Sequence, residues 1–190
     1  MLRQVNRKNT PHLDIDREGS RESVVSNLLE QENPRGGVSA MAQVVASTQI
    51  NTGPEPIWAL LCDPHRYAEI ADPTERMIDV PDHEFGVGYV YKEYGGIKPF
   101  LGESEWRVTE FEPMRRQVHI GDDGSMTMNL GIELTPTDGG TRLTQSLSLT
   151  PRWYLVPVNV ILWPLMMRKR AQEAMDKTVA NVKRIAESSG

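Results

Sequence analysis

The sequence predicts an α+β domain, in which a seven-stranded antiparallel sheet is followed by one long C-terminal helix. Alternation of apolar and polar residues recurs in seven segments after residue 41, and Asp-Gly or Gly-Gly turn signals separate several of them. The C-terminal segment instead carries apolar residues at helical spacing. A sheet of this kind must bury one face, and the long helix is the element that can cover it.

Length, charge and cysteine content limit the function classes. The 190 residues are enough for one ordinary domain, and 38% hydrophobic against 25% charged residues allows a sizeable core. A net charge of −5 argues against a nucleic-acid binder, which needs a basic face. The single cysteine, Cys62, excludes an intramolecular disulfide and a Cys-rich zinc module.

Residues 1–40 differ in composition from the rest of the chain. They contain no Phe, Trp or Tyr, and acidic and basic residues are interspersed along them. We expect a mobile tail with one short amphipathic helix between about Ser20 and Gln31, followed by a single domain over 41–190. Met41 is a second candidate for the natural start. No apolar run typical of a secretory signal occurs in the first thirty residues, which predicts a cytoplasmic protein.

The elements are predicted in the following order. Residues 42–49 alternate as a first strand. Pro54 and Pro56 open a short helix that ends at Asp63-Pro64, and a second helical turn covers Arg66–Ile70. Six strands follow, and a helix from about Pro164 to Glu187 closes the chain. The six strands are Arg76–Val80, Val87–Tyr94, Gly102–Phe111, Arg116–Gly121, Ser125–Pro136 and Thr141–Leu149.

Strand alternation predicts which side chains face the interior. In the 102–111 strand, Trp106 and Val108 share the inward face, which leaves Glu103 and Glu105 on the solvated side and argues against a carboxylate pair. The strand of Tyr89 and Tyr91 has a charge in either row, so its orientation stays open.

Two later strands give unambiguous inward rows. Every second residue from 126 to 134 is apolar, and the row from 143 to 149 contains Gln145 as its single polar member. A buried amide needs a partner, which can be another side chain, a cavity water or a ligand. The inward residues are Met126, Met128, Leu130, Ile132, Leu134, Leu143, Gln145, Leu147 and Leu149.

The segment 153–167 is uncharged and lies between Arg152 and Arg168. Its fifteen residues include two prolines and fall short of the ~20 residues of a membrane-spanning helix. We interpret it as an apolar segment that leads into the buried last helix. The alternative is an exposed apolar segment that contacts a membrane or an apolar partner. Trp163 and Met167 lie at the entrance to the last helix.

The order of elements and several local sequences resemble the START/Bet v 1-like superfamily (SRPBCC, helix-grip fold), particularly its polyketide cyclase/dehydrase-like branch. The resemblance covers roughly 41–188 and implies a curved sheet wrapped around the C-terminal helix, with two short helices between strands 1 and 2. It also implies an elongated cavity for an apolar or amphipathic ligand. The residues that carry it are Ser47–Ile50, Pro56–Leu61 with Asp63-Pro64 and Tyr67, Trp106–Pro113 with Arg115-Arg116, and Gly139–Thr144.

Motifs of metal, nucleotide or nucleophilic chemistry are missing from the sequence. The histidines have no i,i+3 or i,i+4 spacing, and Gly86-Val87-Gly88 precedes a strand, where a nucleotide-binding loop would precede a helix. We therefore predict no metal and no cofactor.

The leading hypothesis is binding or transport of a small hydrophobic or amphipathic ligand, such as a lipid, polyketide or quinone-like molecule, by a monomer or homodimer without nucleic acid. One alternative is a polyketide cyclase or dehydratase-like enzyme, which needs a tuned acid or base such as a tyrosine or His119. The other is an interaction protein that uses the tail helix and 153–167, with transient membrane contact. The predicted cavity-lining residues are Tyr67, Tyr89, Tyr91, Trp106, Val108, Met126, Met128, Gln145, Leu147, Trp163 and Met167.

Overall fold

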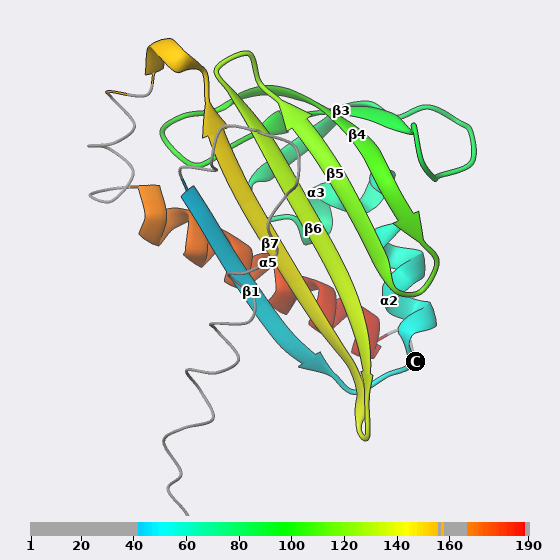
Figure 1. The fold of residues 1–190 in the computed structure, drawn as a ribbon. Helices are drawn as coiled ribbons and strands as arrows, with labels where there is room; N and C mark the ends of the chain where they lie inside the picture. The colour runs from blue at the N-terminus through cyan, green and yellow to red at the C-terminus, as the bar shows by residue number, and fades with distance from the viewer. Residues whose placement is uncertain (1–41, 156, 158–166, 189–190) are drawn as a thin grey trace, which may run out of the picture. The chain divides into compact units, whose positions relative to one another are not determined.

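A single seven-stranded antiparallel sheet forms the framework of the molecule (Figure 1). The structure, a computed structural model, describes residues 42–155, 157 and 167–188. The strand order is β1-β7-β6-β5-β4-β3-β2, so all strands from β2 to β7 lie beside their sequence neighbours and β1 joins the far edge. The strands are β1 (Ala42–Ile50), β2 (Thr74–Asp79), β3 (Val90–Gly95), β4 (Gly102–Glu112), β5 (Arg116–Asp122), β6 (Met126–Thr137) and β7 (Gly140–Pro151).

Short helices connect β1 to β2, as the sequence predicts. Helix α2 (Pro54–Leu61) begins with proline in its first turn and buries Trp58 and Leu61. The second helical turn is longer than predicted. It consists of a 3₁₀ turn, η1 (Pro64–Arg66), whose start is capped by the Asp63 side chain, followed by α3 (Tyr67–Ile70).

The long helix α5 (Arg168–Ser188) lies across one face of the sheet, beside β1 in Figure 1. Its predicted apolar stripe is confirmed, since Met175, Val179 and Val182 are all buried. The first residues of the predicted helix, 164–166, lie outside the described residues. A second 3₁₀ turn, η2 (Trp153–Leu155), follows β7.

Strand boundaries differ most from the prediction at β3. The predicted start at Val87 is wrong, because Gly88 adopts a left-handed conformation (φ 89°) and Tyr89 donates its backbone N–H to Gly86 in a turn. β3 therefore begins at Val90. The predicted orientation of β4 is confirmed, with Trp106 and Val108 buried and Glu103 and Glu105 exposed.

None of the helices in the described part of the chain is long and apolar enough to cross a membrane. The predicted tail helix between Ser20 and Gln31 lies outside the described residues, and so does most of the uncharged segment after Leu155. The division of the chain at residue 40 stays a prediction.

Candidate ligand-binding cavity

A cavity of about 720 Å³ lies inside the domain. Its walls are the inward side chains of β2 to β7, with α3 and α5 on the opposite side. The sheet curves around this space (Figure 1), and two of the α5 residues that face it, Ala171 and Ala174, have small side chains.

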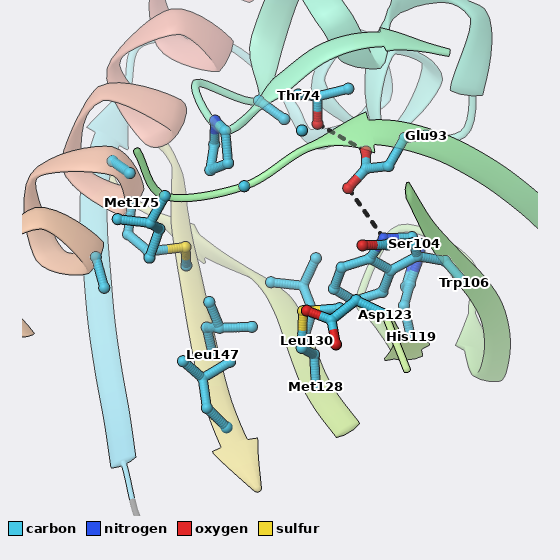
Figure 2. A pocket seen from close by; sticks show the side chains of 18 of the residues that line it. Thr74, Glu93, Ser104, Trp106, His119, Asp123, Met128, Leu130, Leu147 and Met175 are labelled. Atoms are coloured by element: carbon cyan, nitrogen blue, oxygen red, sulfur yellow. Dashed lines mark hydrogen bonds between the residues drawn. The ribbon is translucent and has the colours of Figure 1, made fainter. Parts of the chain in front are cut away.

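One wall of the cavity is apolar and comes from β6 and β7. Met128 and Leu130 of β6 lie beside Leu147 of β7, and Met175 approaches from α5 (Figure 2). Methionine side chains are flexible and polarizable, so this wall can adapt to an irregular apolar surface.

Gln145 is the polar exception on this wall. Its side chain lines the cavity and is only 3% exposed. No group among residues 42–155, 157 and 167–188 forms a hydrogen bond with its amide. Of the three partners that alternation allows, another side chain is therefore ruled out within the described chain. Water and a ligand are left.

The part of the wall that β2, β3 and β4 form carries a polar cluster of Glu93, Thr74, Ser104 and Trp106, which we call the Glu93 cluster. The Thr74 hydroxyl donates to Glu93 Oε2 at 2.7 Å, and the Trp106 indole N–H donates to Oε1 at 2.9 Å (Figure 2). Ser104 lies directly opposite Glu93 in the β3–β4 register and also lines the cavity. Burial raises the pKa of Glu93, while the two hydrogen bonds oppose that shift.

Gly121 creates the space in which Trp106 lies. The two residues are opposite each other in β4 and β5, and a Cβ atom at position 121 would come within 2.7 Å of the indole ring. Tyr91 stacks on the same indole, with ring planes 8° apart. Without a side chain at position 121 the indole can lie flat against β5, which directs its N–H toward Glu93.

A buried chain of hydrogen bonds lies behind the cavity surface. His119 Nε2 donates to Gln117 Oε1 at 2.9 Å, so neutral His119 accepts the Tyr91 hydroxyl at Nδ1, 3.0 Å away. Burial lowers the pKa of His119 to about 4. Gln117 also donates to the thiol of Cys62, whose pKa burial raises to about 12. The thiol is therefore a poor nucleophile at neutral pH.

The cavity wall contains carboxyl groups and no cation among the described lining residues. Lys92, next to Glu93 in sequence, points to the outer face and pairs with Glu105. Asp123 is exposed at the wall, and its Oδ1 accepts hydrogen bonds from the backbone of Ser125 and Met126. Nor do three His, Cys, Asp or Glu side chains in the described chain gather as a metal site would require.

Most of the predicted site residues line this cavity, and two do not. Those on the wall are Tyr67, Tyr91, Trp106, Met126, Met128, Gln145, Leu147 and Met167. Trp163 lies outside the described residues. Tyr89 and Val108 are buried but are absent from the wall, so their assignment as lining residues is wrong.

Aromatic packing explains that correction. Tyr89 donates its hydroxyl to the Pro81 carbonyl at 2.7 Å, and its ring packs against Phe85. Phe85 in turn contacts Phe111, which packs on Trp58. These rings fill the interior at that end of the sheet, so the cavity ends before it reaches Tyr89.

The tyrosines on the wall have already used their hydroxyl groups. Tyr67 donates to the Leu61 carbonyl at 2.8 Å, and Tyr91 is engaged with His119. Burial raises the pKa of both phenols, which keeps them neutral. They present ring surface to the cavity, while their hydroxyl hydrogens are directed to the Leu61 carbonyl and to His119.

Sequence reasoning missed Glu93 as a cavity residue. The signal was present, because Tyr89, Tyr91 and Glu93 are spaced by two and must share a face unless the strand is irregular. Choosing the tyrosines as inward residues therefore also placed Glu93 inside. Thr74 could not be found this way, since it lies before the predicted start of β2.

Comparison with known proteins gives a family. Residues 41–187 match the family model described as polyketide cyclase / dehydrase and lipid transport. The chain belongs to this polyketide cyclase/dehydrase family. Its helix-grip fold, with the curved sheet around the C-terminal helix, is the fold that the sequence resemblance implies. No curated protein matches the chain in sequence.

Several solved structures share this fold at low sequence identity. A protein from Thermus thermophilus is 16% identical with a TM-score of 0.63, and the match covers 78% of this chain and 99% of that one. The ZhuI aromatase/cyclase from Streptomyces sp. R1128 is 15% identical with a TM-score of 0.57, covering 78% and 92%. DynU16, encoded in the dynemicin biosynthetic locus, is 17% identical with a TM-score of 0.55, covering 77% and 48%.

Proposed function

We propose that this member of the polyketide cyclase/dehydrase family binds a small hydrophobic or amphipathic ligand in its internal cavity, for carriage in the cytoplasm. The supporting observation is the cavity itself. Its volume of about 720 Å³ is within the roughly 300–1,000 Å³ of small-molecule sites. Most of its wall is apolar, with a few polar groups, which is the usual composition of such sites. A lipid, a polyketide or a quinone-like molecule belongs to the size class that this volume accommodates.

The state of Gln145 supports a ligand over a dry interior. Its amide faces the cavity, and a dry interior would leave that amide without a hydrogen bond, at a cost of about 1–3 kcal/mol. A ligand oxygen or N–H that meets this amide would remove that cost, and an apolar ligand body would cover the surrounding leucines and methionines.

A cavity-filling variant tests the proposal. The neutral probe N-phenyl-1-naphthylamine should bind one-to-one to the full chain, measured by its fluorescence increase. Leu147→Trp places a large ring in the cavity and should weaken binding by at least about tenfold. Val45→Trp adds the same ring on the exposed face of neighbouring β1 and is the matched control. Equal affinities of the two variants would contradict the proposal. If Leu147→Trp alone weakens binding, native mass spectrometry of the protein purified from its source cells would identify a retained ligand.

A cyclase or dehydratase-like enzyme is the second candidate. Its support is that the wall carries two ionisable groups, the half-buried Glu93 and the buried His119, and that Tyr91 is hydrogen-bonded to His119. Incubation with a linear polyketide mimic should then give a cyclised or dehydrated product, lost in both Glu93→Gln and His119→Gln. A mimic that binds and is recovered unchanged would leave carriage as the function.

Contact with a membrane or another protein is the third candidate. Trp153 is 84% exposed and Tyr154 54% exposed, next to Leu155 on the cavity wall. Aromatic rings of this kind suit a membrane interface through which a hydrophobic ligand is exchanged. Sedimentation with phosphatidylcholine vesicles, compared between the unmodified chain and Trp153→Ala, tests this contact.

A further inference from the structure

The Glu93 carboxyl has hydrogen-bonding capacity left over. A carboxylate offers about four lone-pair sites, and Thr74 and Trp106 use two of them. No cation among the described residues forms an ion pair with Glu93. The group lines the cavity and lies beside Ser104, whose hydroxyl makes no hydrogen bond within the described chain. Glu93 and Ser104 are therefore free to bind a ligand group together.

The charge of the wall limits which group that is. An ionic ligand group leaves water on entering the cavity, and desolvation is costly unless an opposite charge compensates it. For a carboxylate or phosphate no such charge is available, because the described wall carries Glu93 and Asp123 and neither Lys nor Arg. The neutral state of His119 removes the remaining source of positive charge.

We propose that Glu93 anchors the polar group of the ligand, and that this cavity selects a hydrophobic molecule with a neutral hydroxyl or carbonyl group against one with a carboxylate or phosphate. This inference rests on the proposed binding function. A ligand hydroxyl can donate to a free Glu93 lone pair while accepting from Ser104. A ligand carbonyl can accept a hydrogen bond from the Ser104 hydroxyl, which lies opposite Glu93 on the same wall.

Three ligands with the same twelve-carbon chain test the selection. Dodecanol, dodecanoate and dodecylamine are used at pH 8 to displace N-phenyl-1-naphthylamine from the full chain. Dodecanol should bind at least about tenfold more tightly than dodecanoate. Equal affinities, or tighter binding of dodecanoate, would overturn the proposal. Dodecylamine binding about tenfold more tightly than dodecanol would also overturn it, because the selected class would then be cationic.

The variant Glu93→Gln assigns the selection to this side chain. It keeps the shape of the side chain and removes the acid, so dodecanoate affinity should rise by about tenfold while dodecanol affinity stays within about threefold. Glu103→Gln, the same change on the exposed face of β4, should leave the ratio of the two affinities unaltered. An unchanged ratio in Glu93→Gln would overturn the assignment.

Two outcomes separate this inference from the proposed function. If neither the probe nor any of the three ligands binds the unmodified chain, the binding function itself is wrong. If the probe binds and the ligands are not discriminated, the binding function stands and the selection by Glu93 is wrong. The ratio measured on the unmodified chain decides this even where Glu93→Gln does not fold.

Discussion

The two walls of the cavity are built on different principles. The β6–β7 wall consists mostly of methionines and leucines, with one amide, Gln145, that has no hydrogen-bond partner among the described residues. The β2–β5 wall is a hydrogen-bonded arrangement in which Glu93, Trp106, Tyr91 and His119 hold one another in place. Shape and burial determine the first wall, and directional bonds determine the second. Substitutions should therefore have unequal effects on the two.

The largest effect is expected on the hydrogen-bonded wall. Trp106→Ala removes a buried indole and one donor to Glu93, and should lower the free energy of unfolding by about 3 kcal/mol. Ligand affinity should fall as well. Trp153→Ala is the matched control, because that indole is 84% exposed, and urea denaturation measures both variants. Similar decreases in the free energy of unfolding of the two variants would contradict the structural role of Trp106 in this wall.

A smaller effect on the same wall depends on pH. His119 is protonated near pH 6.5 in the unfolded chain but only near pH 4 in the folded one, so stability present above pH 6.5 is lost as the pH falls toward 4. The loss should be about 2 kcal/mol between pH 7.5 and pH 5. Urea denaturation at the two pH values measures this loss. His119→Gln should not show it, whereas His83→Gln, a substitution of an exposed histidine, should show the same loss as the unmodified chain. Identical pH profiles for the two variants would exclude His119 as the source.

On the apolar wall, Gln145→Leu should not destabilise the protein. The substitution removes an amide that has no partner within the described chain, so the ligand-free melting temperature should stay equal or rise. Affinity for a ligand with a polar end that reaches this amide should fall by roughly tenfold, the equivalent of one hydrogen bond. Thermal melts and probe displacement measure the two quantities. A destabilised variant with unchanged affinity would show that Gln145 is a structural residue.

The smallest effect is expected outside both walls. Deleting residues 1–40 should leave the domain folded with a nearly unchanged free energy of unfolding, because this segment has no aromatic and few apolar side chains to contribute. Thermal melts of the full and shortened chains compare the two. Loss of cooperative unfolding on truncation would instead place the predicted tail helix in the core.

The contrast between the walls also explains what the sequence could predict. Alternation over β6 and β7 identified Met128, Gln145 and Leu147 correctly, because a regular strand exposes every second residue to the same face. The order of the elements along the chain followed from alternation and turn signals, and the stripe of α5 from its helical spacing.

Tyr91 and Trp106 of the polar wall were predicted, but its hydrogen bonds were not, because they depend on irregular backbone and on contacts between residues distant in sequence. The turn at Gly88 shifts the start of β3, and Thr74 meets Glu93 only through the pairing of β2 with β3. The extent of the cavity was equally hidden. The cavity ends where Phe85, Phe111 and Trp58 pack together, and no residue spacing in the sequence predicts that contact.

The pairing of the first strand with the last has a consequence for how the molecule forms. Ala42 lies opposite Leu149, so β1 can pair with β7 only after every other strand of the sheet has been synthesised. Closing so long a loop is entropically costly and makes folding slow, since contacts distant in sequence must form together. During synthesis on the ribosome, β1 therefore waits for β7, and α5 follows later still. Because α5 supplies part of the cavity wall, the wall is complete only once this last element has been synthesised, and a ligand of the proposed kind would bind after that point.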